Sequence, residues 1–148
     1  MTTSVYSTIL SAVRNKIEAL NLADLTVKVR RVPLVSRKDP LPLAVISPEQ
    51  ETVEYEETEE EIILKYPVRV TLFFPGNQLL EAELPQLLDF REAIRTALFK
   101  TTLTGASTVI DCTIELNPPF DQTLWAAEYD ASSIRFIYTS QELRESDE

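Results

Sequence analysis

The sequence predicts an α+β fold: a mixed, mostly antiparallel β-sheet with a long β-hairpin and two α-helices packed on one face. Apolar and polar residues alternate from Ile62 to Phe74, which is typical of a long half-buried strand. Residues 4–21 and 84–100 instead carry apolar side chains at helical spacing. Strand-like and helix-like segments do not alternate regularly, so a doubly wound fold is not expected.

The first predicted element is a helix from Ser4 to about Asn21. Ser4 is a suitable N-cap, because its hydroxyl can accept a hydrogen bond from the first turn, and Asn21 is a suitable stop. The apolar positions of this segment recur every three or four residues: Val5, Ile9, Val13, Ile17 and Leu20. This stripe predicts one buried helix face.

Two short strands and a loop follow. Residues 25–29 alternate as a half-buried strand that Pro33 ends or marks as an edge. Residues 36–42 contain two prolines and three charges, which predicts a loop. Residues 43–47 form a short apolar strand closed by Pro48.

Residues 52–57 and 62–74 are predicted to be the arms of a hairpin extension, about 52–74, whose tip lacks an Asn-Gly turn signal. The second arm should bury the face that holds Ile62, Leu64, Tyr66, Val68, Val70, Leu72 and Phe74. Lys65, Arg69 and Thr71 should lie on the opposite, largely solvated face.

The second arm is also unusually long. Thirteen residues would span roughly 43 Å, whereas common strands have about five or six residues. We therefore expect this ribbon to complete its edge pairing through a second copy of the chain. Pro67 interrupts the strand and counts against continuous pairing along it.

The second helix is predicted from Leu84 to Lys100, with Pro85 in its first turn. Its apolar face is Leu84, Leu87, Leu88, Ile94, Ala97 and Leu98, and Arg91 and Arg95 lie outside or beside that face. Residues 109–116 form a strand whose inward positions are Ile110, Cys112, Ile114 and Leu116.

The last third of the chain is less regular. Residues 120–130 are compatible with either a crossing loop or a short helix, and residues 134–139 form the final strand. We expect one domain over residues 1–141 and a frayed acidic tail over residues 142–148.

The net charge of −10 is unevenly distributed. Residues 1–38 hold seven cations and two carboxylates, and the rest of the chain is strongly acidic. The acidic balance argues against a nucleic-acid reader. One hypothesis is that the basic segment of one copy meets the acidic hairpin of another, and the alternative is that both are solvated surfaces. The candidate contact residues are Arg30, Arg31, Arg37, Lys38, Glu54, Glu56, Glu57, Glu59, Glu60, Glu61, Trp125 and Tyr129.

Residue types that carry common chemistry are scarce. The chain has no histidine, two glycines and one cysteine, which excludes His-dependent nucleophile pairs, a P-loop and a Cys/His zinc site. Asp111 and Glu115 are expected to be an exposed pair rather than catalytic acids, and Cys112 a small buried hydrophobe in a chain from a reducing cytosol. We expect no enzyme activity, no cofactor, no metal site and no membrane span.

The layout of the chain resembles a known family. An amphipathic first helix, the hairpin 54–74, the helix 84–100 and a closing strand pair with Trp125 and Tyr129 before the last strand are similar to tail terminator (tail-completion) proteins of long-tailed bacteriophages and prophage particles. The resemblance implies a ring, usually of six copies, on the head-proximal end of the tail tube. Its partners would be other copies, the tail-tube protein and a head connector or neck protein.

The same resemblance implies a virion protein made in the host bacterial cytoplasm, with genome DNA passing through the ring without sequence-specific binding. An acidic channel would repel phosphate, in keeping with the charge. The alternatives are a head-closure or neck protein of the same particle and, from a different class, an acidic DNA mimic that occupies a basic groove. A carboxylate enzyme is a third class, for which the sequence nominates no site.

Overall fold

The computed structural model describes residues 4–56, 61–75, 83–99, 103, 109–116 and 129–143. In chain order the elements are α1 (Val5–Glu18), β1 (Thr26–Val29), β2 (Leu43–Pro48), β3 (Thr52–Glu56), β4 (Glu61–Pro75), α2 (Glu83–Leu98), β5 (Val109–Leu116) and β6 (Tyr129–Leu143). The predicted α+β class is confirmed.

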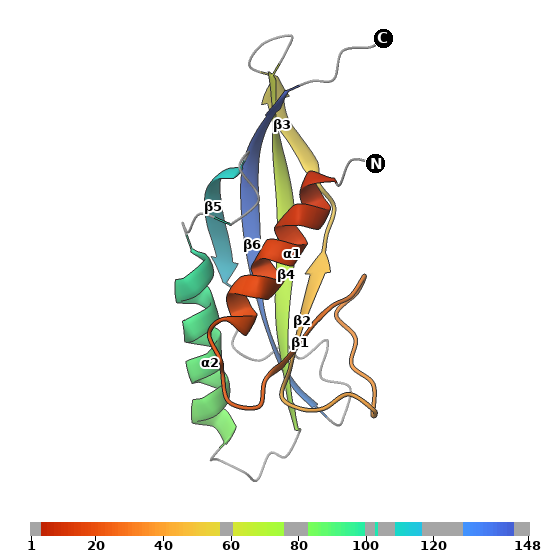
Figure 1. Cartoon of the computed structure of the whole chain (residues 1–148), viewed down its shortest axis with the longest axis vertical. Coiled ribbons are helices and arrows are strands. Elements are labelled where there is room, and N and C mark those ends of the chain that lie inside the picture. The colour runs from red at the N-terminus through yellow and green to blue at the C-terminus, as the bar shows by residue number, and fades with distance from the viewer. Residues whose placement is uncertain are drawn as a thin grey trace.

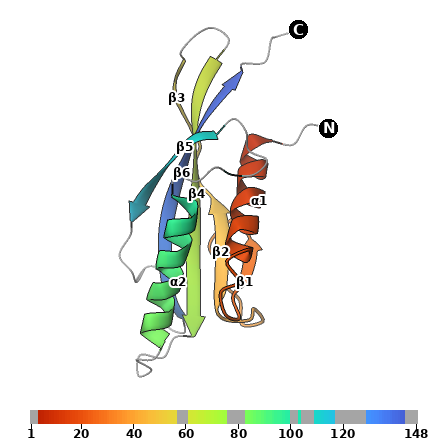
Figure 2. The same cartoon turned by 60° about the vertical axis from the view of Figure 1, so that its left-hand side comes forward.

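All the strands join one six-stranded sheet in the order β1-β2-β4-β6-β5, and β3 pairs with β4 beyond the end of β2 (Figure 1). The β1–β2 pair is parallel and the other pairs are antiparallel. Both helices lie on the same side of the sheet (Figure 2). The long strands β4 and β6 run side by side through the middle of the molecule and set its long axis.

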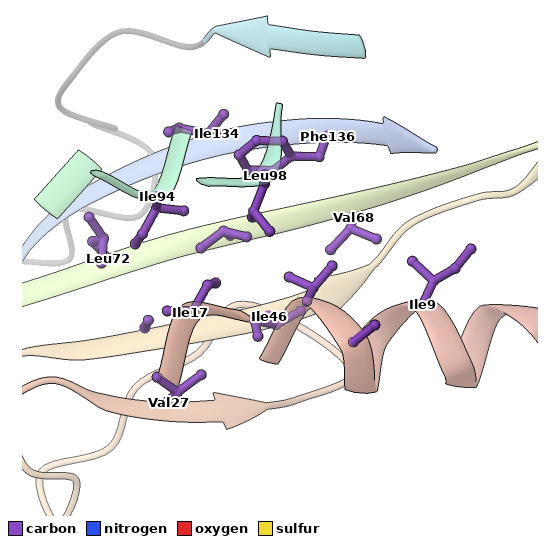
Figure 3. Close-up of a cluster of buried hydrophobic side chains, with 14 of the residues drawn as sticks. Ile9, Ile17, Val27, Ile46, Val68, Leu72, Ile94, Leu98, Ile134 and Phe136 are labelled. Atoms are coloured by element: carbon purple, nitrogen blue, oxygen red, sulfur yellow. The ribbon is translucent and has the colours of Figure 1, made fainter. Parts of the chain in front are cut away.

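The main core fills the space between the helices and the sheet. Ile9 and Ile17 of α1 and Ile94 and Leu98 of α2 point toward apolar side chains of β4, β2 and β6 (Figure 3). Full burial of one such side chain contributes about 1.5–3 kcal/mol, more than a helix of this length gains from intrinsic propensity. Packing on the sheet is therefore the main force that holds both helices.

The opposite face of the sheet is also partly buried, which corrects the expectation that Thr71 lies on a solvated face. Thr71 is fully buried and its hydroxyl lies 3.0 Å from that of Ser133 on β6. A second apolar cluster on this face consists of Leu43, Val45, Phe73 and Ala131, with Val35 and Leu41 packed against it. The segment between β1 and β2 therefore helps to cover the face that the helices leave open.

β4 has strand partners on both edges within its own chain, so the expectation that this long strand completes its edge pairing through a second copy is wrong. β4 is a central strand, paired along one edge with β6 from Glu61 to Pro75. Its other edge pairs with β2 at residues 68–73 and with β3 at residues 62–65. The strand is long because it carries two successive partners on that edge.

Pro67 marks the place where β4 changes partner, so it does not interrupt the ladder. Its carbonyl accepts a hydrogen bond from the Glu49 N–H at 3.3 Å, which directs the backbone of Pro67 toward the gap between β2 and β3. In an antiparallel strand the N–H and C=O of one residue point to the same side. The donor that proline lacks would therefore have faced the gap and not β6.

Three other expectations need correction. Ile110 is 58% exposed, because the register shifts between Val109 and Asp111 and turns it out of the inward series. β6 begins at Tyr129 and continues to Leu143, so it extends well beyond the predicted strand and includes the first two residues of the predicted frayed tail. On α2, Phe90 is buried whereas Leu88 is 37% exposed.

Candidate assembly surface

The basic segment after β1 is organised by an ion pair within the chain. The Arg30 guanidinium donates to both Asp39 oxygens at 2.7 Å, and to the Leu34 carbonyl at 2.8 Å. Asp39 also accepts from the Ser36 N–H at 2.8 Å. The hydrogen bond from Arg30 holds the pKa of the Asp39 carboxyl well below its ordinary value. Arg30 therefore shapes this loop, in addition to any contact that it makes with another molecule.

The other basic candidates of this segment, Arg31, Arg37 and Lys38, are exposed. Apolar side chains accompany them, since Val32 is 44% and Leu34 is 62% exposed. Cations mixed with exposed apolar groups are more typical of a contact surface than of a purely solvated face.

Three of the six acidic candidates lie on the arms of the hairpin. Glu54 and Glu56 belong to β3 and Glu61 begins β4, while Glu57, Glu59 and Glu60 lie outside the described residues. The hairpin arms form one end of the long axis, and the segment after β1 lies in the other half of the molecule (Figure 1). The structure therefore does not bring the two sets together within one chain.

The aromatic candidates are placed only in part. Tyr129 is the first residue of β6, where its backbone pairs with that of Pro75 at the end of β4. Trp125 lies outside the described residues. Its predicted role as a contact stays a prediction.

Three strands carry an edge without a strand partner in the described part of the chain. They are β1 and β5, at the two ends of the sheet order, and β3, which pairs on one side only with β4. Open edges present unpaired backbone groups, which favour association with another chain. The available edges are therefore at the sides of the molecule and on the hairpin, not on β4.

A chain of alternating charges crosses the face opposite the helices. Glu49 pairs with Arg69 at 3.4 Å and with Arg135 at 2.8 Å. Arg135 also donates to Glu115 at 2.7 Å, so Glu115 has a structural partner on β6. The hydrogen bond to Glu115 and that to Glu49 raise the pKa of Arg135. These half-exposed pairs keep the face polar and contribute little stability individually.

Tyr6 of α1 seals the gap at which β4 changes partner. Its hydroxyl accepts from the Glu49 N–H at 2.8 Å, and it lies within donating distance of the carbonyl oxygens of Glu49 and Pro67. Its ring also packs against Tyr66, with centroids 4.9 Å apart. The hydroxyl thereby supplies the polar partner that neither β2 nor β3 provides here.

The described part of the chain contains neither a metal-ligand cluster nor a membrane-spanning helix. No cluster of three or more potential metal ligands occurs among its residues. None of its helices has both the length and the apolar character needed to cross a membrane. Cys112 is 1% exposed, which confirms that it is a small buried side chain.

Sequence reasoning missed the contacts that depend on tertiary pairing. Arg91 of α2 was expected outside or beside the apolar face, yet it reaches β6 and donates to the Ser132 hydroxyl at 2.9 Å and the Ser133 carbonyl at 2.7 Å. Burial lowers the pKa of Arg91. The paired serines in an otherwise strand-like segment were the only signal of a buried polar partner.

Comparisons with known proteins give a fold and no family. No protein-family model matches the sequence, and no curated protein matches it either. Among solved structures, a chain of the "virion of native gene transfer agent (GTA) particle" is similar, with a TM-score of 0.53 and 11% identity. The likeness covers 95% of this chain and 100% of that chain. The protein thus shares its fold with a chain of a gene transfer agent virion.

Proposed function

We propose that this protein is a structural component of a phage or phage-like virion. In this role, copies of the chain form a ring that caps the head-proximal end of a tail tube and joins it to the head. The fold likeness to a chain of a gene transfer agent particle, complete over that chain, is the observation that carries the proposal. The order of elements, similar to that of tail terminator proteins, supports the same role.

The described surface is compatible with assembly. Three strands have open edges, and exposed apolar side chains occur on β1, on the segment after it, on α2 and on β5. When one side of a subunit binds a different side of the next copy, the contact is head-to-tail, and such contacts close into a ring when the rotation between copies allows it. The net charge of −10 suits a channel along which DNA slides without binding.

The proposal assigns the protein no catalytic role. The structure offers no clustered metal ligands among the described residues, and the chain has no histidine. The contact candidates act by recognition alone: the basic segment after β1 toward another copy, and the acidic hairpin, at the end of the long axis, toward the tail tube or the head.

The test is to polymerise tail tubes in the presence of this protein, with the tail-tube protein encoded in the same genome. Tubes polymerised with the protein should be shorter, with ring-shaped density at one end in negative-stain electron microscopy. Tubes of unchanged length with bare ends would contradict the proposal. Binding to the portal or adaptor without binding to tubes would instead favour a head-closure or neck protein. Salt-sensitive 1:1 binding to a nucleic-acid-binding protein would favour a DNA mimic.

A further inference from the structure

The exposed large apolar side chains of the described residues fall into two groups according to the elements that carry them. Three lie on β1 and the segment after it: Val29, Val32 and Leu34. Three lie on α2 with the residue after it and on β5: Leu88, Phe99 and Ile110. β1 and β5 are the two ends of the sheet, and α2 lies on the β5 side (Figures 1 and 2). Only Val53, on the hairpin, falls outside these two groups.

The first group lies in a basic surface. Residues 24–39 hold five cations and two carboxylates, and one of those carboxylates, Asp39, is engaged by Arg30. The "β1 surface" consists of exposed cations and the three apolar side chains: Lys28, Val29, Arg31, Val32, Leu34 and Lys38.

The second group lies in an acidic surface. Leu88, Glu92, Arg95 and Phe99 recur at spacings of four, three and four, which places them on one stripe of α2 and the residue after it. Arg95 is paired with Glu92 at 3.8 Å, and Arg91 is turned inward onto β6. The "β5 surface" is net acidic, with three carboxylates, one cation and three apolar side chains: Leu88, Asp89, Glu92, Arg95, Phe99, Ile110 and Asp111.

We infer that these two surfaces bind each other in different copies of the chain, so that the β1 surface of one subunit docks on the β5 surface of the next. They match in two independent respects, since each presents three exposed apolar side chains and their charges are opposite. The contact is head-to-tail, because it joins two different surfaces of the chain, which lie at opposite ends of one sheet. This inference rests on the proposed ring and names the residues that would build it.

In this arrangement the basic segment after β1 binds the β5 surface of the next copy and not its acidic hairpin. The hairpin lies toward one end of the long axis, whereas α2 and β5 lie across the sheet from β1 (Figure 1). Subunits set side by side, with their long axes roughly parallel, would bring the β1 surface to the β5 surface and leave the hairpins free at one end. Those free ends are then available for the axial partner of the ring.

The test uses the full chain with one surface blocked at a time. Leu34→Glu places a carboxylate in the β1 surface, and Ile110→Lys places a cation in the β5 surface. Val53→Glu and Val53→Lys are matched controls, because Val53 is 61% exposed and the two test residues are 62% and 58% exposed. Analytical ultracentrifugation and native mass spectrometry report the assembly state at equal concentration, and circular dichroism reports folding.

The unmodified chain and both Val53 variants should form the same closed oligomer, whereas Leu34→Glu alone and Ile110→Lys alone should be monomers. A mixture of the two monomeric variants should give a 1:1 heterodimer, because each retains the surface that the other has lost. This mixture is measured at the highest soluble concentration, since a single contact lacks the cooperativity of a closed ring.

A strict monomer for the unmodified chain, an unchanged oligomer for either blocked variant, or a mixture that stays monomeric overturns the inference. The proposed function can fail separately. If both blocked variants keep the ring and still cap tail tubes, the inference fails and the function stands. If the mixture behaves as expected but the unmodified protein leaves tubes uncapped, the function fails and the inference stands.

Discussion

Tyr6 joins the first helix to the part of the sheet where β4 passes from one partner to the next. Tyr6→Phe keeps the ring contact with Tyr66 but removes the hydroxyl that serves Glu49 and Pro67. The Glu49 N–H retains its longer bond to the Pro67 carbonyl, at 3.3 Å. We therefore expect the free energy of unfolding to fall by about 1 kcal/mol, as measured by urea denaturation.

Tyr138→Phe is the matched control for this prediction. The Tyr138 hydroxyl is buried without a hydrogen-bond partner among the described residues, apart from the weakly bonding Cys112 thiol across the strand pair. Burial raises the pKa of Tyr138. Its removal should leave stability unchanged or slightly higher, because no good hydrogen bond is lost. Equal losses in the two variants would show that hydroxyl removal costs stability regardless of hydrogen bonding.

The Arg30–Asp39 pair makes the loop after β1 sensitive to acid. The pKa of Asp39 is lowered in the folded chain relative to its ordinary value of 3.8, so the ionised carboxylate favours folding. That contribution is complete above about pH 4 and is lost as the pH falls toward the folded pKa. Asp39→Asn should lower the free energy of unfolding at pH 7, and the difference from the unmodified chain should shrink below pH 3.8.

Asp24→Asn is the control for the acid prediction. Asp24 is exposed, and its positive φ of 60° is equally accessible to asparagine. Its substitution should shift stability little at any pH. A pH-independent effect of Asp39→Asn in urea titrations at several pH values would contradict the role given to the carboxylate.

For single residues, the sequence predicts those features that depend on near neighbours in the chain. The Ser4 cap and the burial of Cys112 follow from neighbours in the chain or from strand alternation, whereas α1 ends at Glu18, three residues before the predicted stop at Asn21, whose φ is 51°. The side-chain pairing of Thr71 with Ser133 does not follow from near neighbours, because 62 residues separate the two hydroxyls. Polar residues are buried only where tertiary structure supplies a partner, and a single sequence does not reveal that partner.

At the level of elements, the first turn of α1 has two roles. Ser4 accepts a hydrogen bond from the Ser7 N–H at 3.0 Å and thereby fixes the turn that carries Tyr6. Ser4→Ala should lower the free energy of unfolding by about 1 kcal/mol. Ser7→Ala, an exposed change within the same turn, should be nearly neutral and serves as the control.

The two changes at this end of α1 should also be coupled. If the cap positions Tyr6, the loss caused by Tyr6→Phe should be smaller in the Ser4→Ala background, as measured by a double-mutant cycle in urea. Strict additivity would show that the cap and the hydroxyl act independently.

The spacing of apolar residues predicts the positions of strands and helices well, but it does not predict which strands pair. β5 spans the predicted residues 109–116, and the predicted arm of residues 62–74 lies within β4. β6 is longer than predicted because its serines and threonines break the apolar alternation while lying against polar groups of β4 and α2. The length of β4 was correctly identified as unusual, but its cause, two successive partners on one edge, is a property of the sheet.

For the whole molecule, the two ends of the sheet differ in charge, so assembly through them should depend on ionic strength. Exposed charges interact over roughly 8 Å at physiological salt and over about 3 Å at 1 M. We expect the proposed oligomer to dissociate at a higher protein concentration as salt is added, measured by analytical ultracentrifugation. The apolar side chains of both surfaces should prevent complete loss, whereas an increase in stability with salt would indicate a contact dominated by apolar groups.

An exchange of charges between the surfaces tests which acidic region of the next copy binds the basic segment after β1. Arg31→Glu with Lys38→Glu reverses two charges on the β1 surface, and Asp89→Lys with Glu92→Lys reverses two on the β5 surface. Each double variant alone should fail to assemble, since like charges then face each other at every contact. A 1:1 mixture should regain an oligomer of native size in native mass spectrometry, because subunits that alternate meet through opposite charges at both kinds of contact. Glu57→Lys with Glu59→Lys, in the acidic sequence between β3 and β4, provides the matched comparison: this variant keeps both surfaces and should assemble alone, and the closed oligomers in its mixture with the first variant should exclude the first variant. Because single exposed pairs contribute only about 0–1 kcal/mol, the doubled reversals are the smallest changes expected to have a clear effect. Entry of the first variant into closed oligomers with the variant at residues 57 and 59, and not with the β5-surface variant, would make the acidic hairpin the partner of the basic segment.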